Sequence, residues 1–177
     1  ANWLVGYREH SSSFLAILGP IYVFIPCFSL IWIREIAVYG FEFVFWLFLI
    51  VCTTDTCAYV FGGTIRGPKL APTISPGKTW SGFVAGILSA GVVGGTASGY
   101  WFHLDLLAGN WKWGVIALII AVFAQLGDLG ESWVKRKMNV KDSGKLIPGH
   151  GGLLDRVDGF MTSVPVMAFV ILVFGLN

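Results

Sequence analysis

Four polar residues with helical spacing follow an apolar stretch of the sequence, and they are the first candidates for chemistry. Asp128, Glu131, Ser132 and Lys135 stand at positions i, i+3, i+4 and i+7, which places them on one face of a helix. An ionisable group near membrane depth is costly unless it is paired or hydrated, so Asp128 indicates a functional site. The alternative is a structural salt bridge between Glu131 and Lys135 at spacing i, i+4.

A basic, glycine-rich segment at 141–158 is suited to binding phosphate. Its sequence, KDSGKLIPGHGGLLDRVD, cannot form a continuous helix and leaves backbone N–H groups exposed around Gly151 and Gly152. Asp155 and Asp158 follow at spacing i, i+3, and Mg²⁺ prefers one or two carboxylates together with phosphate oxygens and water. The alternative is a basic loop that only sets membrane topology. The side chains placed to contact phosphate are Lys141, Lys145, His150 and Arg156.

The segment SPGKTW, residues 75–80, holds a further set of candidate phosphate ligands: Ser75, Lys78 and Thr79. Its Gly-Lys-Thr run resembles the end of a P-loop, but the full pattern needs a glycine where this chain has Pro72, so we exclude a P-loop nucleotidase. Lys78 either grips a phosphate group or forms a basic turn at the lipid headgroups. The spacing alone favours neither.

The elements that must position these residues are membrane helices. Of 177 residues, 55% are hydrophobic and only 12% are charged, and the mean hydropathy is +0.74, which argues against a soluble domain or a disordered chain. The apolar stretches predict an all-α, polytopic helix bundle that forms one domain over residues 1–177. The five predicted spans are about 14–33, 41–62, 82–102, 113–130 and 159–176.

The predicted spans differ in composition. The second carries Asp55 among three threonines, whose hydroxyls favour a polar cavity over a neutral, hydrogen-bonded carboxyl facing lipid. The third is rich in glycine, alanine and serine, which allow helices to pack closely in lipid. Tryptophans such as Trp46 and Trp113 fall near predicted span ends, so we expect them at the membrane interface.

The distribution of positive charge predicts how the chain is oriented. Ten of the twelve Lys and Arg residues lie in the N-terminal segment or in the loops 64–80 and 131–158, which five spans place on one side. Only Arg34 and Lys112 lie on the other side. Because basic loops remain in the cytoplasm, we expect a polar cavity that faces the cytoplasm.

The polar segments resemble one known family. The runs SWVKR, KDSG and LIPGHGGLLDRVD, all within residues 132–158, are similar to the signature of phosphatidate cytidylyltransferases, also called CDP-diacylglycerol synthases. The segments KLAPTISPGKTWSG, LGDLGES and TTDTCAYVFGG are similar to the same family. The resemblance covers about residues 50–177. Family members usually carry further membrane helices before this region, so we expect this chain to be part of a longer protein.

The resemblance implies a Mg²⁺-dependent nucleotidyltransferase of phospholipid biosynthesis, which uses CTP and phosphatidate to make CDP-diacylglycerol and pyrophosphate. It implies Asp128, Asp155 and Asp158 as ligands of Mg²⁺, with room for a second cation, and Glu131 as a support. The other catalytic residues that it implies are Lys78, Lys135, Arg136, Lys141, Asp142, His150 and Arg156. The residues expected to bind substrate are Ser75, Lys78, Thr79, Ser132, Lys145, Gly151 and Gly152, and Asp55 is expected in a secondary role.

The expected location is the inner membrane of a bacterium, with the lipid bilayer and no nucleic acid as partner; a homo-oligomer is compatible with the sequence. The alternative function is an ion or solute transporter subunit that uses Asp55 and Asp128 as ion ligands within the membrane. That alternative leaves the glycine-rich basic loop unexplained. A CDP-alcohol phosphotransferase is excluded because residues 160–163 lack the Ala-Arg pair of its motif.

Overall fold

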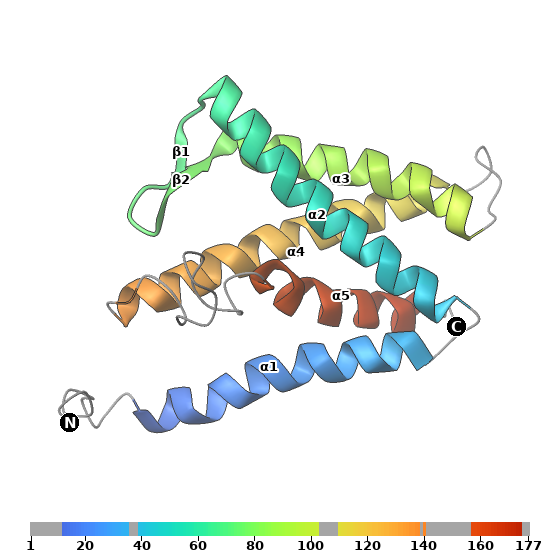
Figure 1. Ribbon diagram of the computed structural model, residues 1–177, viewed down its shortest axis with the longest axis horizontal. Helices are drawn as coiled ribbons and strands as arrows, with labels where there is room; N and C mark the ends of the chain where they lie inside the picture. Colours follow the sequence, from blue (N-terminus) through green and yellow to red (C-terminus); the bar gives the residue numbers. More distant parts are fainter. Residues whose placement is uncertain (1–11, 36–38, 103–109, 139, 141–156, 175–177) are drawn as a thin grey trace, which may run out of the picture.

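The computed structural model describes residues 12–35, 39–102, 110–138, 140 and 157–174, with side chains described except at 12–18 and 110. The described chain forms five helices, and each predicted span coincides with one of them. They are α1 (Ser12–Glu35), α2 (Gly40–Ile65), α3 (Trp80–Trp101), α4 (Asn110–Lys137) and α5 (Asp158–Phe174). The predicted helix bundle is therefore confirmed (Figure 1).

A short antiparallel hairpin, which the sequence did not predict, joins α2 to α3. Its strands are β1 (Lys69–Ala71) and β2 (Ser75–Thr79), and Lys69 pairs with Thr79. Three prolines in this segment indicated a loop without regular structure. A two-stranded hairpin tolerates proline because each strand has one edge without a partner, so a missing N–H need not break the pairing.

The helices run in alternating directions, so the connections between them lie at two opposite ends of the bundle. These two ends carry different residues. Within the described residues, α2, α3 and α4 are long and apolar enough to cross a membrane, while α5 is apolar but shorter. In Figure 1 the hairpin and the C-terminal end of α4 lie at one end, and the end of α1 and the start of α4 lie at the other. Arg34 and Lys112 thus lie opposite the hairpin, in agreement with the predicted division of charge.

Helix α3 packs against α2 and α4 through a face of small residues. This face consists of Gly82, Gly86, Ala90, Gly94 and Ser98, which recur every four residues and are all buried. A Cβ on Gly82 would lie 2.5 Å from the carbonyl oxygen of Ala58, and one on Gly86 would lie 2.7 Å from that of Thr54. The small-residue composition of the third span therefore produces close backbone contact, as expected for helices in lipid.

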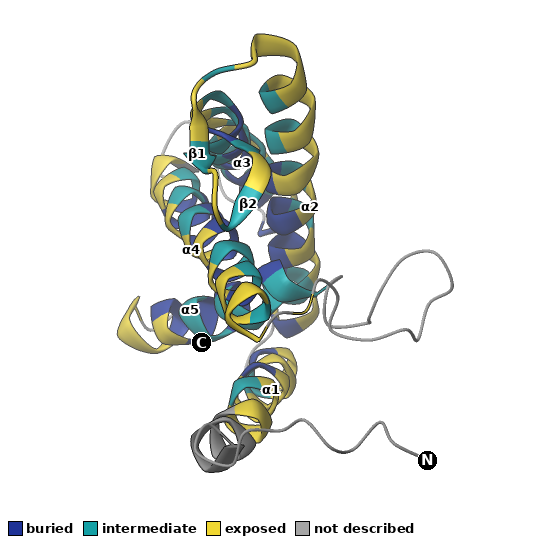
Figure 2. Cartoon of the chain, turned by 90° about the vertical axis from the view of Figure 1, so that its left-hand side faces the viewer, coloured by how far each residue is buried: buried dark blue, intermediate teal, exposed yellow. Residues whose placement is uncertain are grey.

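The end of the bundle opposite the hairpin is filled by aromatic side chains. Trp46 is fully buried and donates its indole N–H to the carbonyl oxygen of Gly94 at 2.8 Å. Trp113 lies edge-on to it, with ring centroids 5.4 Å apart, and Phe102 packs against both. The expectation that Trp46 and Trp113 lie at the membrane interface is wrong, because both face the interior of the bundle. Figure 2 shows the buried residues along the inward faces of the helices.

Replacing Gly86 with alanine should lower the thermal stability of the protein in detergent. The added methyl group meets the carbonyl oxygen of Thr54 at 2.7 Å, and overpacking of this kind costs about 1–3 kcal/mol. Gly63 is the matched control, because a Cβ there meets nothing within 4 Å and alanine favours the helix by about 1 kcal/mol. Equal melting temperatures for Gly86→Ala and Gly63→Ala would contradict the close packing.

Candidate active site

A cavity of about 740 Å³ lies between α2, the hairpin, α3 and α4. Its volume is within the range of pockets that bind small molecules. The polar side chains that line it are Asp55, Tyr59, Arg66, Lys69, Lys78, Thr79, Gln125 and Asp128. Much of the remaining lining is apolar or glycine, including Ala58, Gly62 and Phe83. The cavity therefore combines charged groups of both signs with walls formed by apolar helices.

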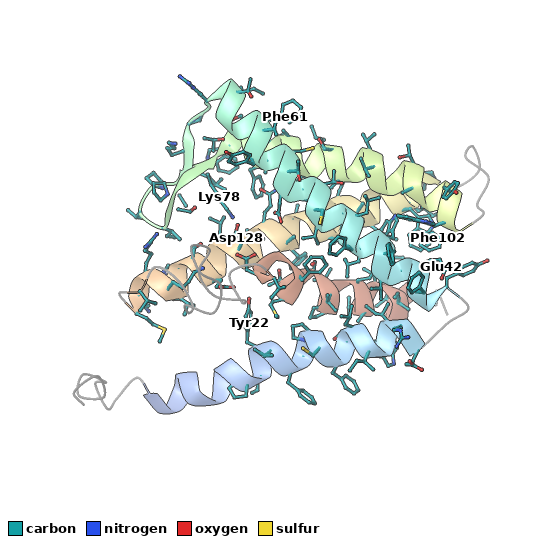
Figure 3. All side chains as sticks on the ribbon, in the orientation of Figure 1. Tyr22, Glu42, Phe61, Lys78, Phe102 and Asp128 are labelled. Atoms are coloured by element: carbon teal, nitrogen blue, oxygen red, sulfur yellow. The ribbon has the colours of Figure 1, made fainter. Side chains whose placement is uncertain are left out.

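An ion pair between the hairpin and α4 lies at this cavity. The ammonium nitrogen of Lys78 lies 2.5 Å from Oδ2 of Asp128 and 3.5 Å from the backbone oxygen of Gln125. The two side chains are 23% and 32% exposed, so removing one would leave a partly shielded charge without its partner. Figure 3 shows the two residues reaching toward each other from their separate elements. A cation from the SPGKTW segment is thus held against the predicted metal ligand.

Local hydrogen bonds at the start of α3 fix the position of Lys78. Thr79 caps the helix, because its side-chain oxygen accepts the N–H of Gly82 at 3.2 Å, and it also contacts the hydroxyl of Ser81 at 3.1 Å. The Ser81 hydroxyl accepts the N–H of Gly67 at 3.3 Å, which ties the entry of the hairpin to its exit. Lys78 directly precedes this cap. Its backbone is therefore held by the cap of α3 and by the hydrogen bond that joins the two ends of the hairpin.

The predicted polar face of α4 is formed, and its members contact one another. The hydroxyl of Ser132 donates to Oδ1 of Asp128 at 3.4 Å. Lys135 lies 3.3 Å from Oε1 of Glu131, and both of these side chains are largely buried. The structural alternative for this spacing, an i, i+4 salt bridge, is therefore present, while Asp128 remains directed at the hairpin.

Asp158, the first residue of α5, belongs to the same acidic group. It precedes the apolar run of that helix. Burial raises the pKa of its carboxyl to about 7, with the negative charge of Asp128 as the next cause and Glu131 and Asp55 adding to it. The N–H of Gly159, 2.7 Å from Oδ1, acts in the opposite direction. Crowded carboxylates of this kind are stabilised by a nearby cation.

The predicted site residues fall into three groups. Lys78, Thr79, Asp55 and Asp128 line one cavity, whereas Ser75 lies on β2 outside its lining. Arg136 holds the hairpin against α4, because its Nε donates to the backbone oxygen at position 74 at 3.3 Å. Glu131, Ser132, Lys135 and Asp158 are described but are not part of the cavity lining. The remaining residues lie outside the described ranges, and the predicted meeting of Asp128 with Asp155 stays a prediction. These residues are Lys141, Asp142, Lys145, His150, Gly151, Gly152, Asp155 and Arg156.

Two charged residues and one amide of the cavity were missed by sequence reasoning. Gln125 donates its side-chain amide to the carbonyl oxygen of Phe83 at 3.1 Å, and it is an isolated amide three residues before Asp128, on the same helical face. Arg66 and Lys69 were counted only as topology charges, yet both line the cavity. Arg66 ends α2 in the left-handed conformation, with φ 50°, and so turns the chain into the hairpin.

The described residues offer two carboxylates, Asp128 and Asp158, as candidate ligands for a cation. No group of three or more His, Cys, Asp or Glu side chains suited to a metal is present in the described ranges. Two carboxylates are nevertheless what Mg²⁺ usually takes from a protein when phosphate and water complete its shell. The donor set therefore fits a cation that binds together with a polyphosphate.

The family profile and the individual proteins that this chain resembles all carry the name cytidylyltransferase. The sequence profile of the cytidylyltransferase family matches residues 3–174. A phosphatidate cytidylyltransferase of Brucella suis is 44% identical over 149 residues, 84% of this chain and 54% of that protein. Those of Rickettsia bellii and Staphylococcus haemolyticus are 40% and 41% identical, over 91% and 75% of this chain and 71% and 50% of theirs. The chain thus spans about half the length of the Brucella and Staphylococcus relatives.

The ion pair at the cavity should stabilise the fold. Lys78→Met and Asp128→Asn should each lower stability in detergent, and the double variant should lose less than the sum, with a coupling of about 0.5–3 kcal/mol. A thermal or denaturant double-mutant cycle measures this coupling. The exposed pair Arg34–Glu35, 3.9 Å apart with both side chains about 70% exposed, is the matched control and should show almost none. Purely additive losses at Lys78 and Asp128 would contradict the pairing.

Proposed function

The chain belongs to the cytidylyltransferase family, and from this premise we propose that it transfers the cytidylyl group of CTP to phosphatidate. The products are CDP-diacylglycerol and pyrophosphate. One observation carries the proposal: Lys78 and Asp128 are paired at a cavity between apolar helices. A phosphate bound to a lipid and a phosphate of a soluble nucleotide could meet at such a place, because it combines charged side chains with walls formed by apolar helices.

The reaction needs charge neutralisation more than it needs a base. A phosphate oxygen of phosphatidate attacks the α-phosphorus of CTP, and the bond from that phosphorus to the β-bridging oxygen breaks, so pyrophosphate leaves with the electron pair. A phosphate monoester is already a nucleophile, so the protein acts through positioning and electrostatic stabilisation. Lys78 is placed to exchange Asp128 for a phosphate oxygen, and Arg66 and Lys69 supply further positive charge along the same cavity.

The proposal includes a requirement for Mg²⁺. Asp128 and Asp158 would hold the ion, since carboxylate oxygens are its preferred protein ligands. Burial, followed by the negative charge of Asp128, raises the pKa of Asp158, and a cation between the two carboxylates would offset both effects. Mg²⁺ would supply neutralisation of the polyphosphate charge and so favour departure of pyrophosphate. Asp128 becomes more available to the ion when Lys78 moves to a phosphate group.

The transporter alternative has less support. It would use Asp55 and Asp128 as ion ligands, but Asp128 is occupied by the ammonium of Lys78 and the hydroxyl of Ser132. The ammonium group held at Asp128 disfavours binding of a free cation at that carboxylate. The relatives of this chain carry the name of an enzyme.

Membranes that contain the chain should convert labelled CTP and phosphatidate into lipid-soluble label. Lys78→Ala should reduce turnover by about 10²–10³, the usual loss when one donor to developing charge is removed. Lys112→Ala is the control, because Lys112 is exposed at the opposite end of the bundle and should leave turnover unchanged. Ion flux without lipid-soluble label would refute the enzymatic function. Nearly full turnover in Lys78→Ala would show that the site is built without this residue.

The cavity should open toward the cytoplasm, where CTP is available. Thr73 lies exposed at the turn of the hairpin, and Lys112 lies exposed at the other end. In a variant without Cys27, Cys52 and Cys57, a membrane-impermeant maleimide added to intact cells should label Lys112→Cys and not Thr73→Cys. Permeabilised cells should show labelling at both positions. The reverse pattern in intact cells would place the cavity on the side without nucleotide and contradict the proposal.

A further inference from the structure

A tyrosine on α1 points toward the acidic group from the side opposite the hairpin. The hydroxyl oxygen of Tyr22 is buried and has no hydrogen-bond partner among the residues that the structure describes. Figure 3 shows its side chain extending from α1 toward Asp128. The carboxylates of Glu131, Asp158 and Asp128 lie close enough to act electrostatically on this hydroxyl. Three acidic side chains from α4 and α5 therefore lie near the neutral hydroxyl of this residue on α1.

Packing alone does not account for this hydroxyl. Phenylalanine would fill the same space between α1 and its neighbours without burying a polar atom. A buried phenol normally has a hydrogen-bond partner, and a buried hydroxyl without one destabilises the fold. The neighbouring positions on α1, Ile21 and Val23, are exposed and apolar, as expected for a helix in contact with lipid. The polar atom of Tyr22 thus points to a role at the carboxylates.

We propose that Tyr22 is a positioning residue for the acidic pair Asp128 and Asp158. When a divalent cation is bound, its hydroxyl donates a hydrogen bond to a carboxylate oxygen of Asp158 that does not face the cation. Helix α5, which carries Asp158, packs directly against α1, so the two groups stand on neighbouring helices. This inference rests on the proposed function, because the cation is part of that function.

A neutral donor suits this position better than a basic residue. Carboxylates that bind metals are usually held by further hydrogen bonds, which fix their orientation. A phenol offers one O–H group to do this and brings no positive charge. Lysine or arginine at the same place would neutralise the carboxylates and compete with the cation. Lys78 already holds one oxygen of Asp128, so Tyr22 would act on the partner carboxylate.

The test measures cation binding directly, with Mn²⁺ as a spectroscopic substitute for Mg²⁺. Free Mn²⁺ is titrated by electron paramagnetic resonance against the purified chain and its Tyr22→Phe variant. The dissociation constant should rise about 10–100-fold in Tyr22→Phe, the usual loss when a hydrogen bond to a ligand is removed. Tyr100→Phe is the control, because Tyr100 is 81% exposed on α3, and its affinity should equal that of the wild type. Without metal, Tyr22→Phe should melt at the same temperature as the wild type or higher.

Activity gives a second, independent measurement. Tyr22→Phe should need correspondingly more Mg²⁺ for half-maximal CDP-diacylglycerol formation and should recover turnover as Mg²⁺ saturates. Unchanged Mn²⁺ affinity in Tyr22→Phe overturns the inference, and a lower melting temperature with unchanged affinity shows packing alone. A wild-type chain that binds Mn²⁺ but makes no CDP-diacylglycerol refutes only the proposed function. A wild-type chain that binds no Mn²⁺ overturns both.

Discussion

The close approach of α3 to α2 and α4 is the contact on which the site depends. Lipid provides no hydrophobic gain for bringing apolar helices together, so the association relies on close packing of small side chains. Gly82 and Gly86 bring the start of α3 against the backbone of α2. The cap at Thr79 extends this fixed start into the hairpin, and Lys78 therefore meets Asp128 on α4. Larger residues at Gly82 and Gly86 would weaken the helix packing, and they would also displace the ammonium group of Lys78 from Asp128.

Apolar run lengths were enough to predict the helices, and the helical period placed Asp128, Ser132 and Glu131 on one face. The residues that were missed depend on tertiary contacts that a single segment does not contain. Trp46 is buried because its face of α2 is directed toward the interior of the bundle. Its distance from the end of the span does not determine this. Tyr22 lies in the middle of a mainly apolar helix, and the packing of α1 on α5 brings its hydroxyl near the carboxylates.

The hairpin was missed for a different physical reason. Its strands are three and five residues long, so strand periodicity is too short to detect. Its prolines indicated a loop, and they are tolerated because neither strand has a second neighbour. The pairing is held from outside instead, by the cap of α3 and by Arg136 of α4. The two ends of the bundle consequently have different chemistry, with aromatic packing at one end and charged contacts at the other.

The carboxylate of Asp128 resembles the anion that Lys78 would bind. Asp128 therefore competes with any anionic ligand for Lys78, which sets a minimum affinity that the ligand must have. A ligand must outcompete an anchored carboxylate that has no translational freedom to lose, so weakly charged anions such as chloride or acetate are poor competitors. A polyphosphate can succeed because it brings several charges and its own cation to replace Lys78 at Asp128. The same internal competitor keeps the total charge of the cavity low between binding events, which lowers the cost of burying it among apolar helices.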